Sequence, residues 1–153
     1  MESATETQVI ERELTIAAQP ETVWKLLAHP EQQSAWWGTA LAFDAVPGGP
    51  FRVEVIPGHI ASGEFVEVDE PSRLVYTWGW EEQGDDGVPP GSTTVEISLA
   101  ADAGGTRLSF VHRDLPTAAS RDSHAHGWDN YLGRLATVAE GGDPGRDPFL
   151  DSM

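Results

Sequence analysis

Apolar and polar residues alternate along much of the chain, and such alternation is typical of half-buried β-strands. The first alternating segment covers residues 9–17, and the later ones lie within residues 51–55, 63–68, 74–80, 95–99 and 108–112. In the segment 63–68 we expect Val66 on the apolar face, and the pattern leaves open which face Phe65 takes. Glycine-rich turns separate these segments, which favours an antiparallel meander.

Helical spacing precedes and follows the later strands. Pro20 stands where a first short helix begins, and Pro30 ends it and begins a second one that reaches Ala35 or Trp36. A long closing helix begins near Ser120, because apolar residues beyond it recur on one helical face. That apolar stripe consists of Trp128, Leu132, Leu135 and Ala139.

These elements predict an α+β fold. An apolar sheet face and one amphipathic helix can bury only against each other, so we expect a curved antiparallel sheet wrapped around the long C-terminal helix. The two short helices after the first strand are expected to close the open end of the sheet. We assign one domain to residues 9–140, a flexible N-terminus to residues 1–8 and a disordered tail to residues 141–153, which contain few apolar residues.

Composition narrows the classes of partner. The formal net charge is -16, so phosphate backbones and anionic lipid surfaces are repelled, and we expect no nucleic-acid partner and no membrane insertion. Cysteine is absent, which excludes disulfides, thiolate metal sites and cysteine nucleophiles. The N-terminal residues have neither the basic nor the apolar part of a secretory signal. We therefore expect an acidic cytoplasmic protein.

Several short motifs follow one another along the chain. They are Pro20-Glu21-Thr22-Val23-Trp24, Trp36-Trp37-Gly38, Gly48-Gly49, Gly63-Glu64, Arg73-Leu74-Val75-Tyr76-Thr77-Trp78, Gly105-Thr106-Arg107-Leu108 and Gly127-Trp128. In the order and spacing of these motifs, from about Val9 to Ala139, the chain resembles homologues of the activator of heat shock protein 90 ATPase, within the SRPBCC or START-like superfamily.

The resemblance implies the helix-grip fold, as in Bet v 1, with a cavity between the sheet and the C-terminal helix. Relatives in that superfamily bind lipids, sterols, plant hormones or polyketides, and some are aromatase/cyclases. The eukaryotic co-chaperones of the family carry an additional N-terminal domain that stimulates the chaperone, and the 153 residues leave no room for it. A chaperone partner is therefore kept only as an alternative.

Aromatic residues occupy many inward-facing positions and are the main candidates for ligand binding, because they offer flat apolar surface and, in tryptophan and tyrosine, one polar group each. The predicted ligand-binding residues are Trp37, Phe51, Val53, Tyr76, Trp78, Phe110, His112, His124 and Trp128. The alternative interpretation of Tyr76 and Trp78 is ordinary core packing. Of the adjacent Trp36 and Trp37, we expect one to pack and the other to face the cavity entrance or the solvent.

Two histidines stand at inward-facing positions. His112 shares a strand face with Phe110, and His124 lies one turn before Trp128 on the closing helix. Inside a cavity they could transfer protons or orient a carbonyl group; alternatively, each hydrogen-bonds a backbone group near the end of its element. His124 and His126 occupy different helix faces and are a poor zinc pair, so we predict no metal site.

Together these features predict a protein that binds a small hydrophobic molecule, aromatic or polycyclic, in the cavity between sheet and C-terminal helix, without a cofactor. A second interpretation is a cyclase- or hydratase-type enzyme that uses His112 or His124 as general acid or base, although the residues favour binding over catalysis. A third interpretation is a chaperone-interacting module. The sequence leaves the choice between monomer and homodimer open.

Overall fold

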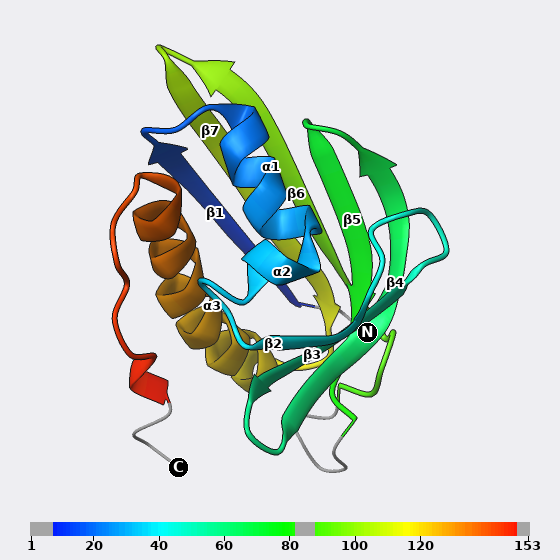
Figure 1. Cartoon of the computed structure of the whole chain (residues 1–153). Coiled ribbons are helices and arrows are strands. Elements are labelled where there is room, and N and C mark those ends of the chain that lie inside the picture. Colours follow the sequence, from blue (N-terminus) through cyan, green and yellow to red (C-terminus); the bar gives the residue numbers. More distant parts are fainter. Residues whose placement is uncertain (1–7, 82–87, 150–153) are drawn as a thin grey trace.

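The computed structural model describes residues 8–81 and 88–149 of the chain. Its strands are β1 (Gln8–Ile16), β2 (Thr39–Phe43), β3 (Pro50–Ile56), β4 (His59–Asp69), β5 (Arg73–Trp78), β6 (Thr93–Asp102) and β7 (Gly105–Leu115). Its helices are α1 (Pro20–Ala28), α2 (Pro30–Gln33) and α3 (Ala118–Ala139). The order of the elements, from first strand to closing helix, agrees with the order predicted from the sequence (Figure 1).

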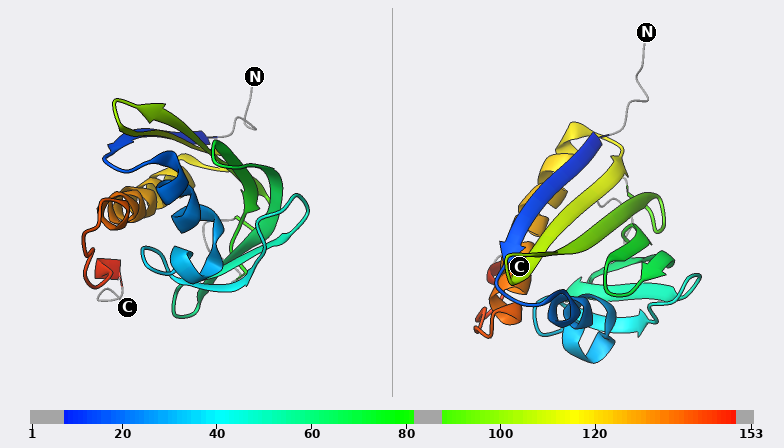
Figure 2. Two further views of the ribbon diagram at one scale, coloured as in Figure 1. Left: turned by 45° about the horizontal axis from the view of Figure 1, so that its top comes forward. Right: turned by 90° about the horizontal axis from the view of Figure 1, so that it is seen from above.

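The strands form one antiparallel sheet that curves around the helices. Within the described residues its strand order is β1-β7-β6-β5-β4-β3-β2. Each strand therefore pairs with its neighbour in the chain, except that β1 pairs with β7. Figure 2 shows the sheet bending around α1, α2 and α3. This arrangement confirms the predicted α+β helix-grip fold.

Local signals fix the ends of the helices. Pro20 occupies the first turn of α1, which ends at Ala28 before the next proline. Thr117 caps α3, because its side-chain oxygen accepts a hydrogen bond of 3.0 Å from the backbone N–H of Ser120. Gly141 follows α3 with a φ of 89°, a left-handed conformation that glycine adopts without strain. These signals determine the residues at which α3 begins and ends.

The buried residues of β7 and α3 are those that the sequence pattern predicts. In β7, Leu108, Phe110 and His112 share one face and are fully buried. The buried stripe of α3 includes Trp128, Leu132, Leu135 and Ala139. Polar residues cover the other side of α3, and no helix in the described part of the chain is long and apolar enough to cross a membrane.

In β4 the apolar face differs from the prediction. Phe65 is buried, whereas Val66 is 53% exposed. The pairing of β4 with β5 shifts register between Phe65 and Glu67. A bulge of this kind adds one residue to the strand and changes which side chains share a face. The prediction that Val66 lies on the apolar face is therefore wrong.

Trp36 and Trp37 are both buried, at 2% and 3% exposure. Neither faces the solvent, so the solvent alternative of the prediction is wrong, whereas Trp37 borders a pocket. Helix α2 ends at Gln33, and both tryptophans lie beyond it. A turn does not impose the helical angle of about 100° between neighbours. The two rings stack with centroids 5.0 Å apart, and the Trp36 indole N–H donates to the carbonyl of Leu26 over 2.8 Å.

Residues 141–149 run back beside α3 (Figure 1); we call this segment the C-terminal strap. The sequence predicted a disordered tail from residue 141 on, but the strap contains a buried side chain, Asp147, which is hydrogen-bonded to α3. The carboxylate of Asp147, the bond from Arg134 to Pro144 and the ring of Phe149 attach the strap to α3, and no apolar repeat in residues 141–149 indicates these contacts. Residues 150–153 and residues 1–7 lie outside the described residues.

Candidate functional site: an aromatic pocket between the sheet and the closing helix

A pocket of about 240 Å³ lies between the sheet and α3. The sheet contributes residues of β3, β4 and β5, the turn after α2 contributes Trp37, and the strap contributes Phe149. The complete lining consists of Trp37, Val55, Ile56, His59, Trp78, Trp80, Ser123, His124, Gly127, Trp128, Tyr131 and Phe149. Six of these twelve residues are tryptophan, tyrosine or phenylalanine, so flat ring surfaces form much of the wall.

The structure divides the predicted ligand-binding residues into two groups. Those on the pocket wall are Trp37, Trp78, His124 and Trp128. Those buried elsewhere in the core, outside the lining, are Phe51, Val53, Tyr76, Phe110 and His112. The second group fills the interior behind the wall; Phe51 and Tyr76, for example, stack with ring centroids 4.2 Å apart. For these residues the geometry fits the core interpretation that the sequence left open for Tyr76.

Three tryptophans of the pocket wall contact one another. The rings of Trp37 and Trp78 stack with centroids 5.8 Å apart and an angle of 17° between their planes. Trp128 lies 5.5 Å from Trp37 and 5.2 Å from Trp78, tilted by 51° to each. Because each ring is held by the other two, the wall presents a preformed aromatic surface to the pocket.

His112 lies behind this wall, where both of its ring nitrogens are hydrogen-bonded. The Trp128 indole N–H donates to Nδ1 over 3.0 Å, and Nε2 lies 2.8 Å from the Thr93 hydroxyl oxygen. The Thr93 hydroxyl itself donates to the carbonyl of Trp78, so the proton of His112 is on Nε2. Burial, and then the neighbouring His124, lower the pKa of His112 well below its ordinary value of 6.5. His112 is therefore neutral. It binds Trp128 of α3 directly and Trp78 of β5 through the Thr93 hydroxyl, and so connects the two elements that carry these tryptophans.

His124 is on the pocket wall and has the opposite tautomer. Its Nδ1 lies 2.8 Å from the carbonyl oxygen of Ser120, which can only accept, so Nδ1 carries the proton. Its Nε2 accepts the indole N–H of Trp80 over 3.0 Å. These two hydrogen bonds fix the imidazole ring, and they occupy both nitrogens that a general acid or base would use.

Two indole N–H groups of the pocket residues have no acceptor. Within the described residues, Nε1 of Trp37 and Nε1 of Trp78 are buried and make no hydrogen bond. The other two buried side-chain atoms without a partner in that part of the chain, Oε1 of Gln33 and Oγ of Ser120, belong to residues outside the pocket lining. Buried donors without an acceptor are rare, and each is costly to desolvate. Both nitrogens are enclosed by neighbouring atoms, so an acceptor in the pocket reaches them only after these side chains shift.

The strap is anchored to α3 through the carboxylate of Asp147. One oxygen accepts the Tyr131 hydroxyl over 2.5 Å, and the other accepts the Asn130 amide over 3.2 Å and the backbone N–H of Phe149 over 2.9 Å. Burial, the hydrogen bond to Asp147 and the charge of Asp147 raise the pKa of Tyr131 well above its ordinary value. Phe149 is thereby placed edge-on to Tyr131, with ring centroids 5.6 Å apart.

Sequence reasoning did not predict several wall residues. His59, Trp80, Tyr131 and Phe149 belong to the lining, and the first two bring a second imidazole and a further indole to the pocket. Trp80 shares the strand alternation of Trp78, and Tyr131 lies beside the apolar stripe of α3, so both patterns contained a signal. His59 and Phe149 follow turns in segments without a clear pattern.

As for metals, no cluster of three or more potential ligand side chains exists among residues 8–81 and 88–149.

A curved sheet that encloses a long helix and an aromatic pocket defines a helix-grip protein of the SRPBCC type. The family model for Activator of Hsp90 ATPase homolog 1-like proteins matches residues 17–140. The chain therefore belongs to this family, which confirms the resemblance found in its sequence. A comparison with curated proteins gives no match.

Solved structures agree with this assignment. An AHSA1-like protein from Rhizobium etli is 44% identical, with a TM-score of 0.76 over 97% of this chain and 92% of that chain. DynU16, a protein of the dynemicin biosynthetic locus, is 26% identical with a TM-score of 0.76, over 90% of this chain and 49% of that chain. The Aha1 dimer from Colwellia psychrerythraea is 17% identical with a TM-score of 0.73, over 88% of this chain and 98% of that chain, and shares the fold.

Proposed function

We propose that the chain binds a small hydrophobic molecule of roughly one or two rings that carries a hydrogen-bond acceptor. The observation that carries this proposal is the aromatic pocket wall around the stacked Trp37 and Trp78, whose enclosed indole N–H groups have no partner and would gain one from a ligand once the adjacent side chains shift. Each is a donor, so the complementary group on the ligand is an acceptor such as a carbonyl oxygen or a ring nitrogen.

The size of the pocket supports a small ligand. An apolar protein cavity of about 150 Å³ holds a benzene molecule, and sites for drug-sized ligands begin at about 300 Å³. The pocket, at about 240 Å³, lies between these limits. A one- or two-ring molecule fits that volume, whereas a sterol-sized ligand exceeds it.

Charge and hydrogen bonding favour a neutral ligand that is bound and not transformed. The net charge of -16 disfavours anions. Both nitrogens of His124, the histidine of the predicted pair that lies on the wall, are already used by Ser120 and Trp80. Acid–base catalysis would first have to break one of these bonds, so the geometry supports binding more than the cyclase or hydratase alternative. A chaperone partner and the choice between monomer and homodimer stay predictions.

The relation to DynU16 is consistent with a small organic ligand, because that protein is encoded in a biosynthetic locus. It does not identify the ligand of this chain. A test therefore uses model compounds chosen by their chemistry.

The test compares two bicyclic probes of nearly equal shape, α-tetralone, which has a ketone, and tetralin, which has none. Isothermal titration calorimetry is expected to show tighter binding of α-tetralone. Trp78→Phe and Trp37→Phe keep an aromatic ring but remove the N–H, and each is expected to weaken α-tetralone binding about fivefold while leaving tetralin nearly unaffected. Trp24→Phe, a buried tryptophan of α1 outside the pocket lining, is the matched control.

Two results would contradict the proposal. If neither probe binds, the pocket does not take ligands of this class. If both probes bind equally and the two wall variants leave their affinities unchanged, the indole N–H groups do not select an acceptor.

A further inference from the structure

A second pocket of about 320 Å³ is lined by the turn after α2, the end of β3, and residues of α3 and the strap. It shares Trp37, Val55 and Ile56 with the first pocket. Its remaining lining is more polar and includes Arg134 and Asp147. The two pockets are therefore neighbours that have one wall in common.

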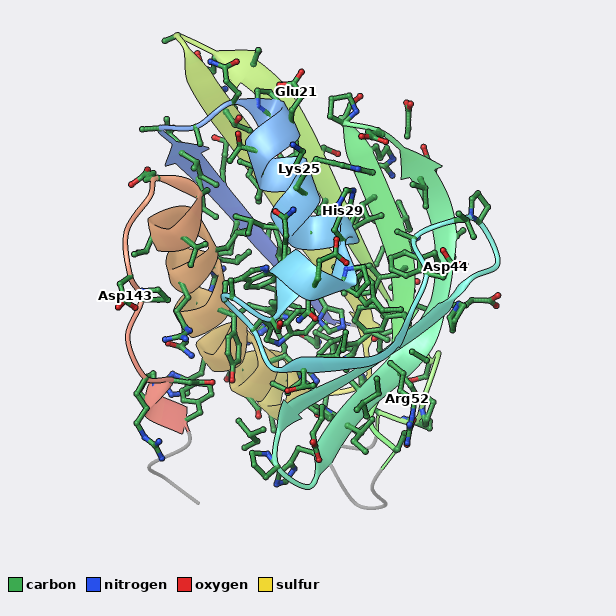
Figure 3. All side chains as sticks on the ribbon, in the orientation of Figure 1. Glu21, Lys25, His29, Asp44, Arg52 and Asp143 are labelled. Carbon is green, nitrogen blue, oxygen red and sulfur yellow. The ribbon has the colours of Figure 1, made fainter. Side chains whose placement is uncertain are left out.

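The strap contributes to both pockets. Phe149 lines the first and Asp147 lines the second, so two residues of one short segment bound two adjacent spaces. Figure 3 labels Asp143 on the outer course of the strap, where its side chain is exposed and accepts the backbone N–H of Gly145 over 2.8 Å. The part of the strap that reaches the pockets is thus its distal end, beyond residue 146.

Asp147 joins that distal end to α3. Asp147 receives the Tyr131 hydroxyl and the Asn130 amide from α3; we call these contacts the strap lock. A further hydrogen bond from an α3 side chain to the strap runs from Arg134 to the carbonyl of Pro144 over 3.3 Å, nearer the start of the strap. Because a hydrogen bond to a carboxylate is among the stronger ones in proteins, the Tyr131 hydroxyl is the main contact that the lock would lose on opening.

We propose that the strap sets the size limit of the ligand site, with Tyr131 and Asp147 as its specificity-determining pair. With the lock closed, Phe149 completes the first pocket and the site takes one or two rings. When the lock opens, Phe149 and Asp147 leave their positions, and the two pockets join around Trp37 into one groove for a polycyclic ligand. This inference rests on the proposed function of the first pocket.

The two ligand sizes then respond in opposite directions to the lock. A large ligand binds only the open form, so its apparent affinity is reduced by the fraction of molecules that are open. Removing the bond from Tyr131 to Asp147 raises that fraction by about tenfold or more, and the affinity for a large ligand rises by the same factor. A small ligand uses Phe149 as a wall, so its affinity falls when the strap opens.

The test measures binding of two ketones, α-tetralone and the four-ring benzanthrone, whose fluorescence responds to the polarity of its surroundings. The variants are Tyr131→Phe, which removes only the hydroxyl, and Asp147→Asn, which removes the charge and keeps the shape. Both are expected to raise benzanthrone affinity about tenfold or more and to lower α-tetralone affinity. Asp143→Asn makes the same charge change at an exposed strap position and is expected to alter neither affinity.

A ligand-free measurement separates this inference from the proposed function. Hydrogen exchange of residues 141–149, followed by mass spectrometry, is expected to speed up in the two lock variants and not in Asp143→Asn. If α-tetralone binds the wild type but benzanthrone affinity or strap exchange is the same in all variants, the size-limit inference fails alone. If neither ketone binds any variant, the proposed function fails and the size limit fails with it, whatever the exchange data show about the lock.

Discussion

The interior beneath the sheet has two parts, one filled and one open, although the same strands form both. In the filled part, Phe51, Phe65 and Tyr76 lie against one another with ring centroids between 4.2 and 5.8 Å apart. In the open part, the tryptophan wall borders a pocket of about 240 Å³. The boundary crosses individual strands: Tyr76 is core and Trp78, two residues later on the same face, is pocket wall.

Hydrogen bonding differs between the two parts more than residue type does. In the filled part His112 uses both ring nitrogens. On the pocket wall the indole N–H groups of Trp37 and Trp78 have no acceptor within the described residues. Folding normally pairs buried polar groups, so the two unpaired indoles distinguish Trp37 and Trp78 from the fully paired His112, although Gln33 and Ser120 also keep an unpaired atom outside the pocket lining. Aromatic content alone does not make this distinction.

The largest expected difference between the two parts is in stability. Val53 and Val55 lie on the same face of β3, at 0% and 8% exposure, and only Val55 lines the pocket. Val53→Ala leaves a closed void, and we expect the free energy of unfolding to fall by about 2–3 kcal/mol. Val55→Ala enlarges a space that already exists, so a loss of about 1 kcal/mol is expected. Urea unfolding measures both values, and equal losses would mean that the boundary does not lie between these residues.

The next effect concerns the pH dependence of stability. The folded-state pKa of His112 lies below 6.5, so the unfolded chain binds the extra proton as the pH falls below that value. The free energy of unfolding is therefore expected to decrease with falling pH, by up to about 1.4 kcal/mol per pH unit, until the folded-state pKa is reached. In His112→Asn, which retains an acceptor for Trp128, the part of this slope due to His112 is lost.

Urea unfolding at several values between pH 6.5 and about pH 5 gives this slope. The window lies above the range in which the carboxyl groups of Glu81 and Glu96 titrate, because their ion pairs lower the pKa of each below 4.5. Identical slopes in wild type and His112→Asn would show that His112 takes up its proton as readily in the folded protein as in the unfolded chain.

The sequence predicts the fold well because periodicity depends directly on burial. The alternation in β7 identifies Leu108, Phe110 and His112 as inward-facing, and the helical repeat identifies the stripe of α3; the structure confirms both. Where the backbone departs from a regular element, the pattern fails. The bulge beside Val66 and the turn that carries Trp36 are the two examples.

The candidate site was only partly predictable, for a different reason. Periodicity separates inside from outside, but it does not tell a filled interior from a hollow one. Phe110 and Trp128 contact each other with ring centroids 4.7 Å apart, yet only Trp128 borders the pocket. That difference depends on the curvature of the sheet and on the strap. The strap position in turn depends in part on the carboxylate of Asp147, which no pattern in the tail indicates.

The smallest expected effect separates the pocket from the helix that supports it. Gly127 and Gly133 both lie within α3, but only Gly127 lines the pocket. A Cβ atom at Gly127 would meet Phe149 at 3.8 Å, an ordinary contact, and one at Gly133 would meet nothing within 4 Å. Alanine at either position restricts the unfolded chain and favours the helix, so each variant is expected to gain about 0.5–1 kcal/mol of stability.

The two alanine variants should differ in ligand binding. In Gly127→Ala the added methyl group occupies part of the pocket and the affinity for α-tetralone is expected to fall, whereas Gly133→Ala is expected to bind like wild type. Thermal unfolding and calorimetric titration of the same samples test both expectations. Equal affinities in two equally stabilised variants would remove this face of α3 from the binding wall, and would restrict the site to the tryptophans contributed by the sheet and by the turn after α2.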